Sequence, residues 1–452
     1  MGLDVTGGAG GVGAALEDLS AAASRLVETA GDLSEVSGTL LRAGVAADLP
    51  TVALVSPVDS LRVAAALAEL TGPTGLAADA AALVALAATV RSAVAAYAAG
   101  EAAVTLLVES AQDAVVLALS RQVPLLAVGA AAAERSGLDI GAAADRLLFA
   151  APWLADLAGG VEGAVAGPVT ALDYEDGLTL LAAAGSSRGW LTESGRRVQV
   201  TAVPTAGRAD APESLADLLA TQDDLEGPEG EPDRVRVVQV PQADGSSAWV
   251  VVIPGTQVWS PRAGPNPSDL TSDVLLMAQQ ETLLAAGVER ALHLAQQDAG
   301  RAGLADPVLV AGHSQGGIVA AALAADPGFR QRQRVTHVVA SGAPIARMPV
   351  PADVSVLALE HRQDAVPRLE GERNADRRGR VTVTRDLRGS EVRTAGASHA
   401  AVRYRDTAAL VDASASRSLA VWRQGSDPFL AGRRHGPPTV RDFRVERVGL
   451  AR

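Results

Sequence analysis

Apolar residues recur every three or four positions near the beginning of the chain. From Gly10 to about Leu41 this spacing predicts an amphipathic helix with one buried stripe. The stripe comprises Val12, Leu16, Leu19, Ala23, Leu26, Ala30 and Leu33. Further helices are expected over residues 61–70 and 76–119, on either side of a Gly-Pro-Thr-Gly turn. Because small residues occupy most packing positions, residues 1–165 are predicted to form an all-α bundle.

After about residue 166 the periodicity changes to that of strands alternating with helices. Residues 166–235 are predicted to be a connecting segment with two strands, 197–203 and 234–240, and an exposed acidic loop, Asp223 to Asp233. Residues 236–452 are predicted to form an α/β domain. Its strands are expected at 249–253, 308–311, 335–340 and 354–359, and its helices at 270–302, 318–325 and 400–419. Continuous apolar strands alternating with helices predict a mostly parallel sheet with helices on both faces.

Composition narrows the classes of function. The formal net charge of −13 argues against nucleic-acid binding, which needs a cationic surface. The chain has no Cys, which excludes disulfides, thiolate nucleophiles and Cys-based metal sites. We expect neither a metal nor another cofactor. Charges interrupt the Ala-rich stretches, so no transmembrane segment is predicted. The N-terminal sequence lacks a basic region followed by an apolar core, so neither a Sec nor a twin-Arg signal is expected.

The most informative stretch runs from Val308 to Ala320. An apolar strand, a Gly-x-Ser-x-Gly pattern and an apolar helix follow one another, with Ser314 between Gly312 and Gly316. A serine hydroxyl becomes a nucleophile when a sharp turn holds it exposed beside a base. The same turn would aim the backbone N–H of Gln315 at a tetrahedral oxyanion. The pattern therefore predicts a nucleophile at Ser314.

An acid and a base are expected later in the chain, in that order. Asp364 follows the strand 354–359 and is the favoured acid, with Glu360 as the competing candidate. Of the six His residues, His399 is the favoured base because it follows the acid and lies where a loop runs into a helix. The other five, which fit the order or placement less well, are His293, His313, His337, His361 and His435.

A second oxyanion donor is expected where the strand 249–253 ends in Pro254-Gly255. The backbone N–H of Thr256 or of Gln257 would serve, with the Thr256 hydroxyl as an extra donor. The following loop, 260–268, is either a lid or an ordinary surface loop.

Together these motifs resemble the class 3 lipases among the α/β-hydrolases. The resemblance covers about the last 200 residues and is carried by Ile253-Pro-Gly-Thr256, Gly312-His-Ser-Gln-Gly-Gly317, Gly342-Ala-Pro344, His361-Arg-Gln-Asp364-Ala-Val-Pro367 and His399. It implies Ser314 as nucleophile, Asp364 as acid, His399 as base, and Gln315 with Thr256 in the oxyanion hole. Pro254 stands where the group usually has Arg, and Ala365 where it often has Pro. The chain is also similar to actinobacterial hydrolases with a helical N-terminal extension.

The helical extension carries a Tyr97-Ala-Ala-Gly-Glu101 pair that is similar to the Tyr-x-x-x-Asp/Glu signal of type VII secretion substrates. A cytoplasmic protein is expected, with type VII secretion as the alternative, and the extension would be a surface for a helical partner.

The expected activity is hydrolysis of a small-molecule or lipid carboxylic ester through an acyl-enzyme on Ser314. Thioesterase and peptidase activities remain open. So does a catalytically inactive interaction protein built on the same fold.

Overall fold

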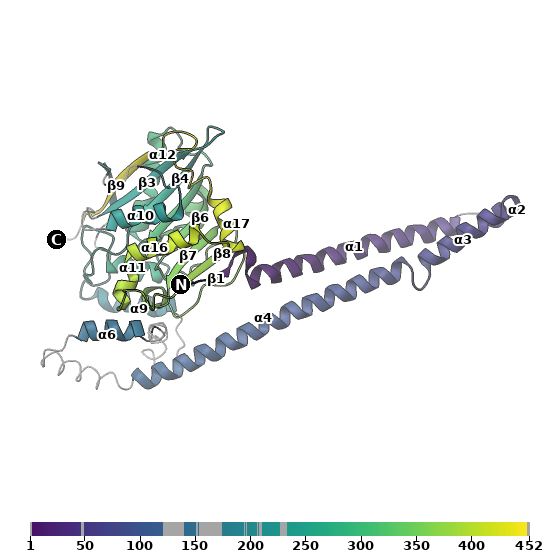
Figure 1. Cartoon of the computed structure of the whole chain (residues 1–452), viewed down its shortest axis with the longest axis horizontal. Helices are drawn as coiled ribbons and strands as arrows, with labels where there is room; N and C mark the ends of the chain where they lie inside the picture. Colours follow the sequence, from purple (N-terminus) through teal and green to yellow (C-terminus); the bar gives the residue numbers. More distant parts are fainter. Residues whose placement is uncertain are drawn as a thin grey trace. The chain divides into compact units, whose positions relative to one another are not determined.

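The structure is a computed structural model that describes residues 2–46, 49–120, 140–150, 152, 174–193, 195, 197–205, 207, 210–226 and 233–449. They fall into two compact units (Figure 1). We call Val12–Val108 the hairpin unit, and Met1–Gly11 together with Glu109–Arg452 the sheet unit. The first eleven residues, assigned to the helical region from the sequence, thus belong to the sheet unit. The boundary expected near residue 165 lies outside the described residues, and that at residue 235 falls inside a strand.

The N-terminal region is helical, as predicted. Its helices are α1 (Val12–Ala46), α2 (Leu49–Val55), α3 (Pro57–Thr71) and α4 (Leu76–Ser120). The chain turns back through α2 into α3, and α3 packs against α1. Both α3 and α4 run antiparallel to α1 (Figure 1).

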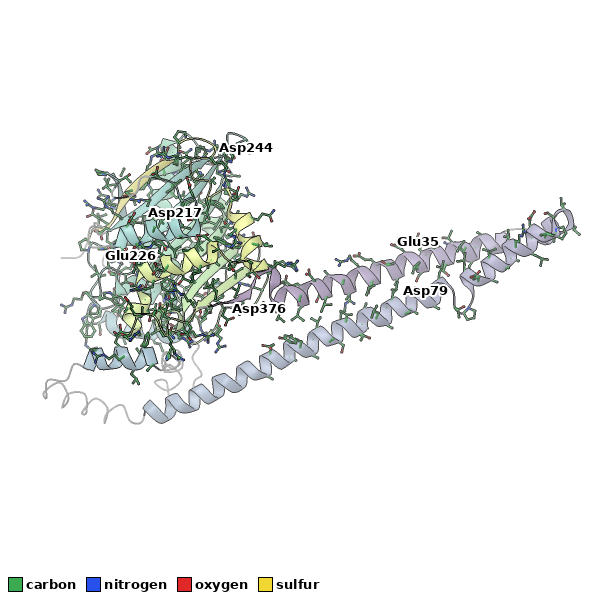
Figure 2. The ribbon with its side chains drawn as sticks, viewed as in Figure 1. Glu35, Asp79, Asp217, Glu226, Asp244 and Asp376 are labelled. Atoms are coloured by element: carbon green, nitrogen blue, oxygen red, sulfur yellow. The ribbon has the colours of Figure 1, made fainter. Side chains whose placement is uncertain are left out.

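The stripe predicted for α1 is only partly buried. Ala23 and Ala30 are fully buried, whereas Val12 and Leu19 are 48% and 46% exposed. Small side chains permit close approach between helices, so the buried apolar positions of α1 are alanines and the larger apolar side chains stay at least partly exposed. Charged residues of this unit, among them Glu35 and Asp79, also lie on exposed helix faces (Figure 2).

By length and composition alone, the stretch Pro57–Glu101 is apolar enough to cross a membrane, and few of its residues are buried. The sequence instead predicts that charges interrupt every such stretch. Soluble helices pass the same test, so the absence of a transmembrane segment stays a prediction.

The sheet unit is built on one nine-stranded sheet in the order β1-β8-β7-β6-β5-β4-β3-β9-β2. The five central strands, β4 to β8, pair in parallel, and the flanking pairs are antiparallel. This is the mostly parallel α/β fold that the sequence predicts. The bounds are β1 Leu3–Gly7, β2 Arg197–Val203, β3 Arg234–Pro241, β4 Ser247–Ile253, β5 Pro307–His313, β6 Arg334–Ser341, β7 Ser355–His361, β8 Arg380–Arg385 and β9 Thr439–Val448.

Helices cover both faces of this sheet. One hydrophobic cluster joins the sheet to α12 and α13, and a second joins its other face to α10, α16 and α17. The bounds are α6 Ile140–Ala150, α9 Tyr174–Ser186, α10 Leu215–Glu226, α11 Leu270–Met277, α12 Leu283–Asp298, α13 Gln315–Ala325, α14 Pro327–Arg332, α15 Ala395–His399, α16 Ala401–Asp412 and α17 Arg417–Ser426. Strands β5 to β7 are buried along nearly their whole length, which explains their continuous apolar sequences.

Three sequence-based assignments need correction. The single helix expected over 270–302 is two helices, because Gln279 has a positive φ of 54° and Thr282 caps a new helix by accepting from the Ala285 N–H. The helix expected over 400–419 is likewise divided into α16 and α17. The acidic loop expected from Asp223 begins as the last turn of α10, which ends at Glu226.

Candidate active site

Ser314 lies between the end of β5 and the start of α13 in a strained backbone conformation. Its φ of 51° and ψ of −123° are rare for a residue with a side chain. The turn closes tightly because its neighbours are glycines: a Cβ on Gly312 would come within 2.0 Å of the Gly316 carbonyl carbon. A Cβ on Gly316 would lie 2.2 Å from the Ile253 oxygen of β4. The local sequence thus produces the strand–turn–helix geometry of a nucleophile elbow.

The three residues predicted as nucleophile, base and acid lie in one hydrogen-bonded line. His399 Nε2 is 2.9 Å from Ser314 Oγ, and His399 Nδ1 is 2.8 Å from Asp364 Oδ2. An ionised carboxylate only accepts, so Nδ1 of a neutral His399 carries the proton and Nε2 is free to accept from the serine hydroxyl. The catalytic roles of these residues remain a prediction, but their geometry is that of a Ser-His-Asp arrangement.

Asp364 is fully buried, and three donors keep it ionised. Burial alone would raise its pKa, but His399, the Tyr404 hydroxyl at 2.5 Å and the Val366 N–H at 2.9 Å together lower the pKa below its usual range. Tyr404 was not singled out from the sequence. It lies five residues after His399, on α16, and no local sequence signal distinguished it from other helix residues.

Glu360, the competing acid, contacts neither Ser314 nor His399 among the contacts of the described residues. Its Oε1 accepts from Asn374 Nδ2 at 2.6 Å, and burial raises its pKa to about 7. A carboxyl group that remains partly protonated near neutral pH is a poorer partner for an imidazolium than an ionised one. The geometry therefore favours Asp364.

His361 supports the site without touching Ser314. Its ring stacks on Tyr404 with centroids 3.9 Å apart, and its Nδ1 donates to the Ser398 carbonyl at 2.7 Å. Burial lowers the pKa of His361 to about 4, so the ring is neutral. It holds the backbone next to His399 and keeps the Tyr404 ring in place.

The expected oxyanion donors lie beside the nucleophile. A Cβ on Gly255 would come 3.1 Å from Ser314 Cβ, so the turn containing Thr256 is next to the elbow. The backbone N–H groups of Gln315 and Thr256 have no acceptor among the residues that the structure describes. The Gln257 alternative is wrong, because its N–H donates to the Ser268 carbonyl at 2.8 Å. The Thr256 hydroxyl is likewise committed elsewhere, as it donates to Asp273 Oδ2 at 2.9 Å.

Asp273, on α11, joins the two expected oxyanion residues, Thr256 and Gln315, through their side chains. Its Oδ2 accepts from Thr256 Oγ1, and its Oδ1 accepts from Gln315 Nε2 at 2.8 Å. Burial raises the pKa of Asp273 to about 7, although both hydrogen bonds oppose this. One carboxyl group therefore fixes the spacing between two N–H groups that would bind an oxyanion. No sequence signal distinguished Asp273 from an ordinary helix N-terminal aspartate.

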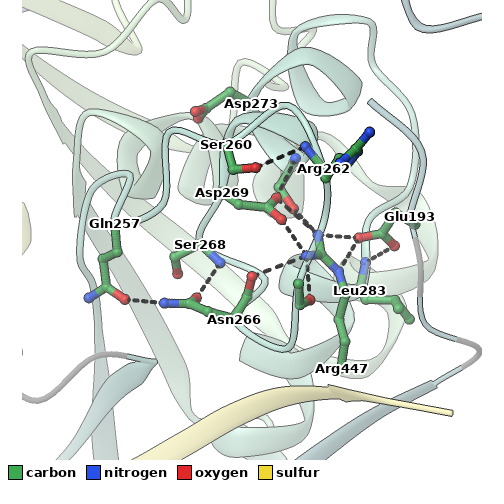
Figure 3. Close-up of polar contacts among 12 residues, drawn as sticks. Glu193, Gln257, Ser260, Arg262, Asn266, Ser268, Asp269, Asp273, Leu283 and Arg447 are labelled. Atoms are coloured by element: carbon green, nitrogen blue, oxygen red, sulfur yellow. Dashed lines mark hydrogen bonds and ion pairs between the residues drawn. The ribbon is translucent and has the colours of Figure 1, made fainter. Parts of the chain in front are cut away.

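The loop 260–268 is firmly held. Arg447 of β9 is fully buried, pairs with Asp269 and Glu193, and donates to the carbonyls of Gly264 and Asn266 at 3.3 and 3.1 Å (Figure 3). Asn266 in turn donates to the Gln257 side chain at 2.8 Å. These contacts favour the ordinary-loop interpretation over a lid, because opening would break buried charge-assisted bonds.

Within the part of the chain that the structure describes, no group of three His, Cys, Asp or Glu side chains has the arrangement of a metal site.

The comparisons with known proteins agree with this reading of the fold. Residues 270–416 match the family model described as PGAP1-like alpha/beta domain. No curated protein and no solved structure matches the chain. The matched segment contains Ser314, Asp364 and His399 but neither Thr256 nor the hairpin unit, and it does not address the resemblance to class 3 lipases. The chain thus contains a domain of the α/β-hydrolase type, similar over this segment to the PGAP1-like family.

Proposed function

We propose that this protein is a serine hydrolase that cleaves carboxylic esters through an acyl-enzyme on Ser314. The observation that carries the proposal is the continuous hydrogen-bonded line from Ser314 Oγ through His399 to Asp364, at 2.9 and 2.8 Å, on a strained elbow. A backbone held in such a conformation costs of the order of 1–3 kcal/mol and is typical of functional turns.

In the proposed reaction His399 Nε2 takes the Ser314 proton while Oγ attacks the ester carbonyl carbon. The N–H groups of Gln315 and Thr256 bind the oxyanion of the tetrahedral intermediate. His399 then gives its proton to the leaving alcohol, and an acyl-Ser314 ester remains. A water molecule, deprotonated by His399, attacks this ester and releases the carboxylic acid. Asp364 holds the His399 tautomer and stabilises the imidazolium at both stages.

Thioesters and amides would pass through the same intermediates, so the leaving group decides between an esterase, a thioesterase and a peptidase. The test is a panel of short-chain ester, thioester and amide substrates that share one acyl group, assayed with the wild type and Ser314→Ala. We expect ester turnover in the wild type and a loss of about 10⁶-fold in the variant. Turnover that persists in Ser314→Ala would contradict the proposal.

A second role, in binding a partner, is favoured by the apolar side chains around α2 and the start of α3. Leu54, Val55, Val58 and Leu61 are between 60% and 87% exposed. Exposed apolar clusters of this kind commonly mark interaction sites. Tyr97 and Glu101 both lie on α4, and cytoplasmic residence and type VII export stay predictions.

A further inference from the structure

A second His–carboxylate pair lies directly beside the proposed catalytic one. His313, the residue before Ser314, places its Nδ1 2.8 Å from Glu226 Oε2, and its ring centroid is 4.7 Å from that of His399. Glu226 is the last residue of α10, within the segment that the sequence analysis had assigned to an exposed loop. Neither residue has a part in the proposed reaction.

Both ring nitrogens of His313 face acceptors. Nε2 is 2.8 Å from the backbone carbonyl oxygen of His399, and Nδ1 faces the Glu226 carboxylate. Two acceptors require two N–H donors, which is the charged form of the ring. Burial alone would lower the pKa of His313, but the Glu226 charge and the two hydrogen bonds raise it. The two side chains therefore form an ion pair with a buried imidazolium, and this ion pair holds the backbone of the proposed base.

Glu226 also reaches the opposite side of the site. Its Oε1 accepts from the Gly255 N–H at 2.7 Å, one residue before the oxyanion residue Thr256. Burial would raise the pKa of Glu226, yet His313 and the Gly255 N–H lower it. A glutamate at the last position of a helix faces the negative end of the helix dipole, which is an unfavourable place for an anion. The contacts to His313 and Gly255 offset this cost.

We propose that Glu226 and His313 are positioning residues for the hydrolase site: together they fix the backbone of His399 relative to the Gly255–Thr256 turn. The inference rests on the proposed function. Hydrogen bonds run from the Gly255 N–H to Glu226, from Glu226 to His313, and from His313 to the His399 carbonyl oxygen. They connect the Gly255–Thr256 turn with the proposed base. A buried ion pair contributes little net stability compared with apolar packing. The pair contacts the Gly255–Thr256 turn, the elbow and the backbone of His399. These contacts are better explained by a role in fixing the relative positions of these three parts of the site.

The test compares Glu226→Ala, Glu226→Gln and a control, Glu370→Gln, in the full chain. Glu370 is buried and accepts from two backbone N–H groups, those of Ala346 and Arg347, but among the described residues it makes no hydrogen bond or ion pair with the site. We measure kcat and KM for a short-chain ester, the melting temperature, and the fraction of active sites by end-point fluorophosphonate titration. The titration separates a slower enzyme from a partly unfolded one.

In Glu226→Ala we expect kcat to fall about 100-fold with KM within threefold, because small displacements of the reacting groups cost about that much. The kcat of Glu226→Gln should be at least tenfold higher than that of Glu226→Ala, because the amide oxygen still accepts from the Gly255 N–H and the amide group still bonds to His313. Glu370→Gln should retain the wild-type kcat. Rescue by the glutamine separates positioning from a loss of fold, which would lower the titrated fraction instead.

If folded Glu226→Ala keeps kcat within twofold of the wild type, the inference is overturned while the proposed function stands. If the wild type neither hydrolyses esters nor reacts with the fluorophosphonate, the proposed function itself fails. Where Glu226→Ala yields no folded protein, the double variant Glu226→Gln with His313→Gln replaces it, since it fills the same space without charge. A fall in kcat of at least tenfold at unchanged KM supports the inference there, and a kcat within twofold of the wild type overturns it.

Discussion

The hairpin unit and the sheet unit bury different kinds of side chain. In the hairpin unit the buried apolar residues are alanines, such as Ala23, Ala30 and Ala87, whereas the core of the sheet unit includes Trp249 and Phe443. All six His residues of the chain lie in the sheet unit. Catalysis needs polar groups held in a dry and rigid setting, which a bulky core provides. In the hairpin unit the helices pack through alanines, and many of the larger apolar side chains stay at the surface, where they are available to contact a partner.

The largest expected effect belongs to the buried acid of the sheet unit. Asp364→Asn should lower kcat about 10⁴-fold with the fold intact, because the imidazole loses the partner that sets its tautomer. The measurement is steady-state ester hydrolysis together with circular dichroism. A mild loss here beside a severe loss in Glu360→Gln would transfer the role to Glu360.

A smaller effect is expected when Asp364 keeps its charge but loses one donor. Tyr404→Phe removes a hydrogen bond of 2.5 Å to Asp364 Oδ2. A bond to a charged group contributes about 1.5–3 kcal/mol, so we expect kcat to fall by about tenfold or somewhat more. Because the Tyr404 hydroxyl helps to lower the pKa of Asp364, the loss should be larger at pH 5 than at pH 8.

The matched control for this variant is Tyr97→Phe on α4 of the hairpin unit. Its kcat should equal that of the wild type at both pH values. An equal loss in the two variants would mean that the contrast between the units does not extend to catalysis.

Glu360→Gln should change stability rather than turnover. Burial raises the pKa of Glu360 to about 7, above its value of about 4.5 in an unfolded chain, so the folded state binds this proton more tightly. The wild type therefore loses stability as the pH rises from about 4.5 through 7, and the uncharged glutamine does not. Relative to the wild type, the variant should gain up to about 3 kcal/mol in free energy of unfolding between pH 5 and pH 8.

Urea unfolding at the two pH values measures this gain. If the difference in free energy of unfolding between Glu360→Gln and the wild type were the same at pH 5 and pH 8, the pKa of Glu360 would not be raised in the folded protein.

The smallest effect is expected in the hairpin unit. Leu54→Ser and Val55→Ser change side chains that are 86% and 87% exposed and should leave kcat for a small soluble ester within twofold of the wild type. The same assay measures it. A loss of tenfold or more would contradict the view that the hairpin unit contributes nothing to the chemical step.

The sequence predicted the central strands because buried parallel strands must be continuously apolar. Ser314, Asp364 and His399 could be proposed because the elbow, the strand end and the order in the chain constrain each of them. Strands β1, β8 and β9 were missed. β1 and β9 pair with strands that are remote in the sequence, and their burial is incomplete.

Contacts over long sequence separations could not be predicted in the same way. Glu226 is 87 residues from His313, and Tyr404 is 40 residues from Asp364. The local sequences around Glu226 and Tyr404 do not differ from those of solvent-exposed helices. The same applies to the Thr256 hydroxyl, which the sequence offers as an extra oxyanion donor, because only the fold reveals that Asp273 accepts from it.

The most direct test of the central claim is covalent labelling of the native chain by a fluorophosphonate, with the modified residue located by peptide mass spectrometry. The account predicts stoichiometric phosphonylation at Ser314, none in Ser314→Ala, and labelling slowed by orders of magnitude in His399→Ala, where no base activates the hydroxyl. Heat-unfolded protein should not react. Labelling at another residue, or equal labelling of native and unfolded protein, would contradict the account.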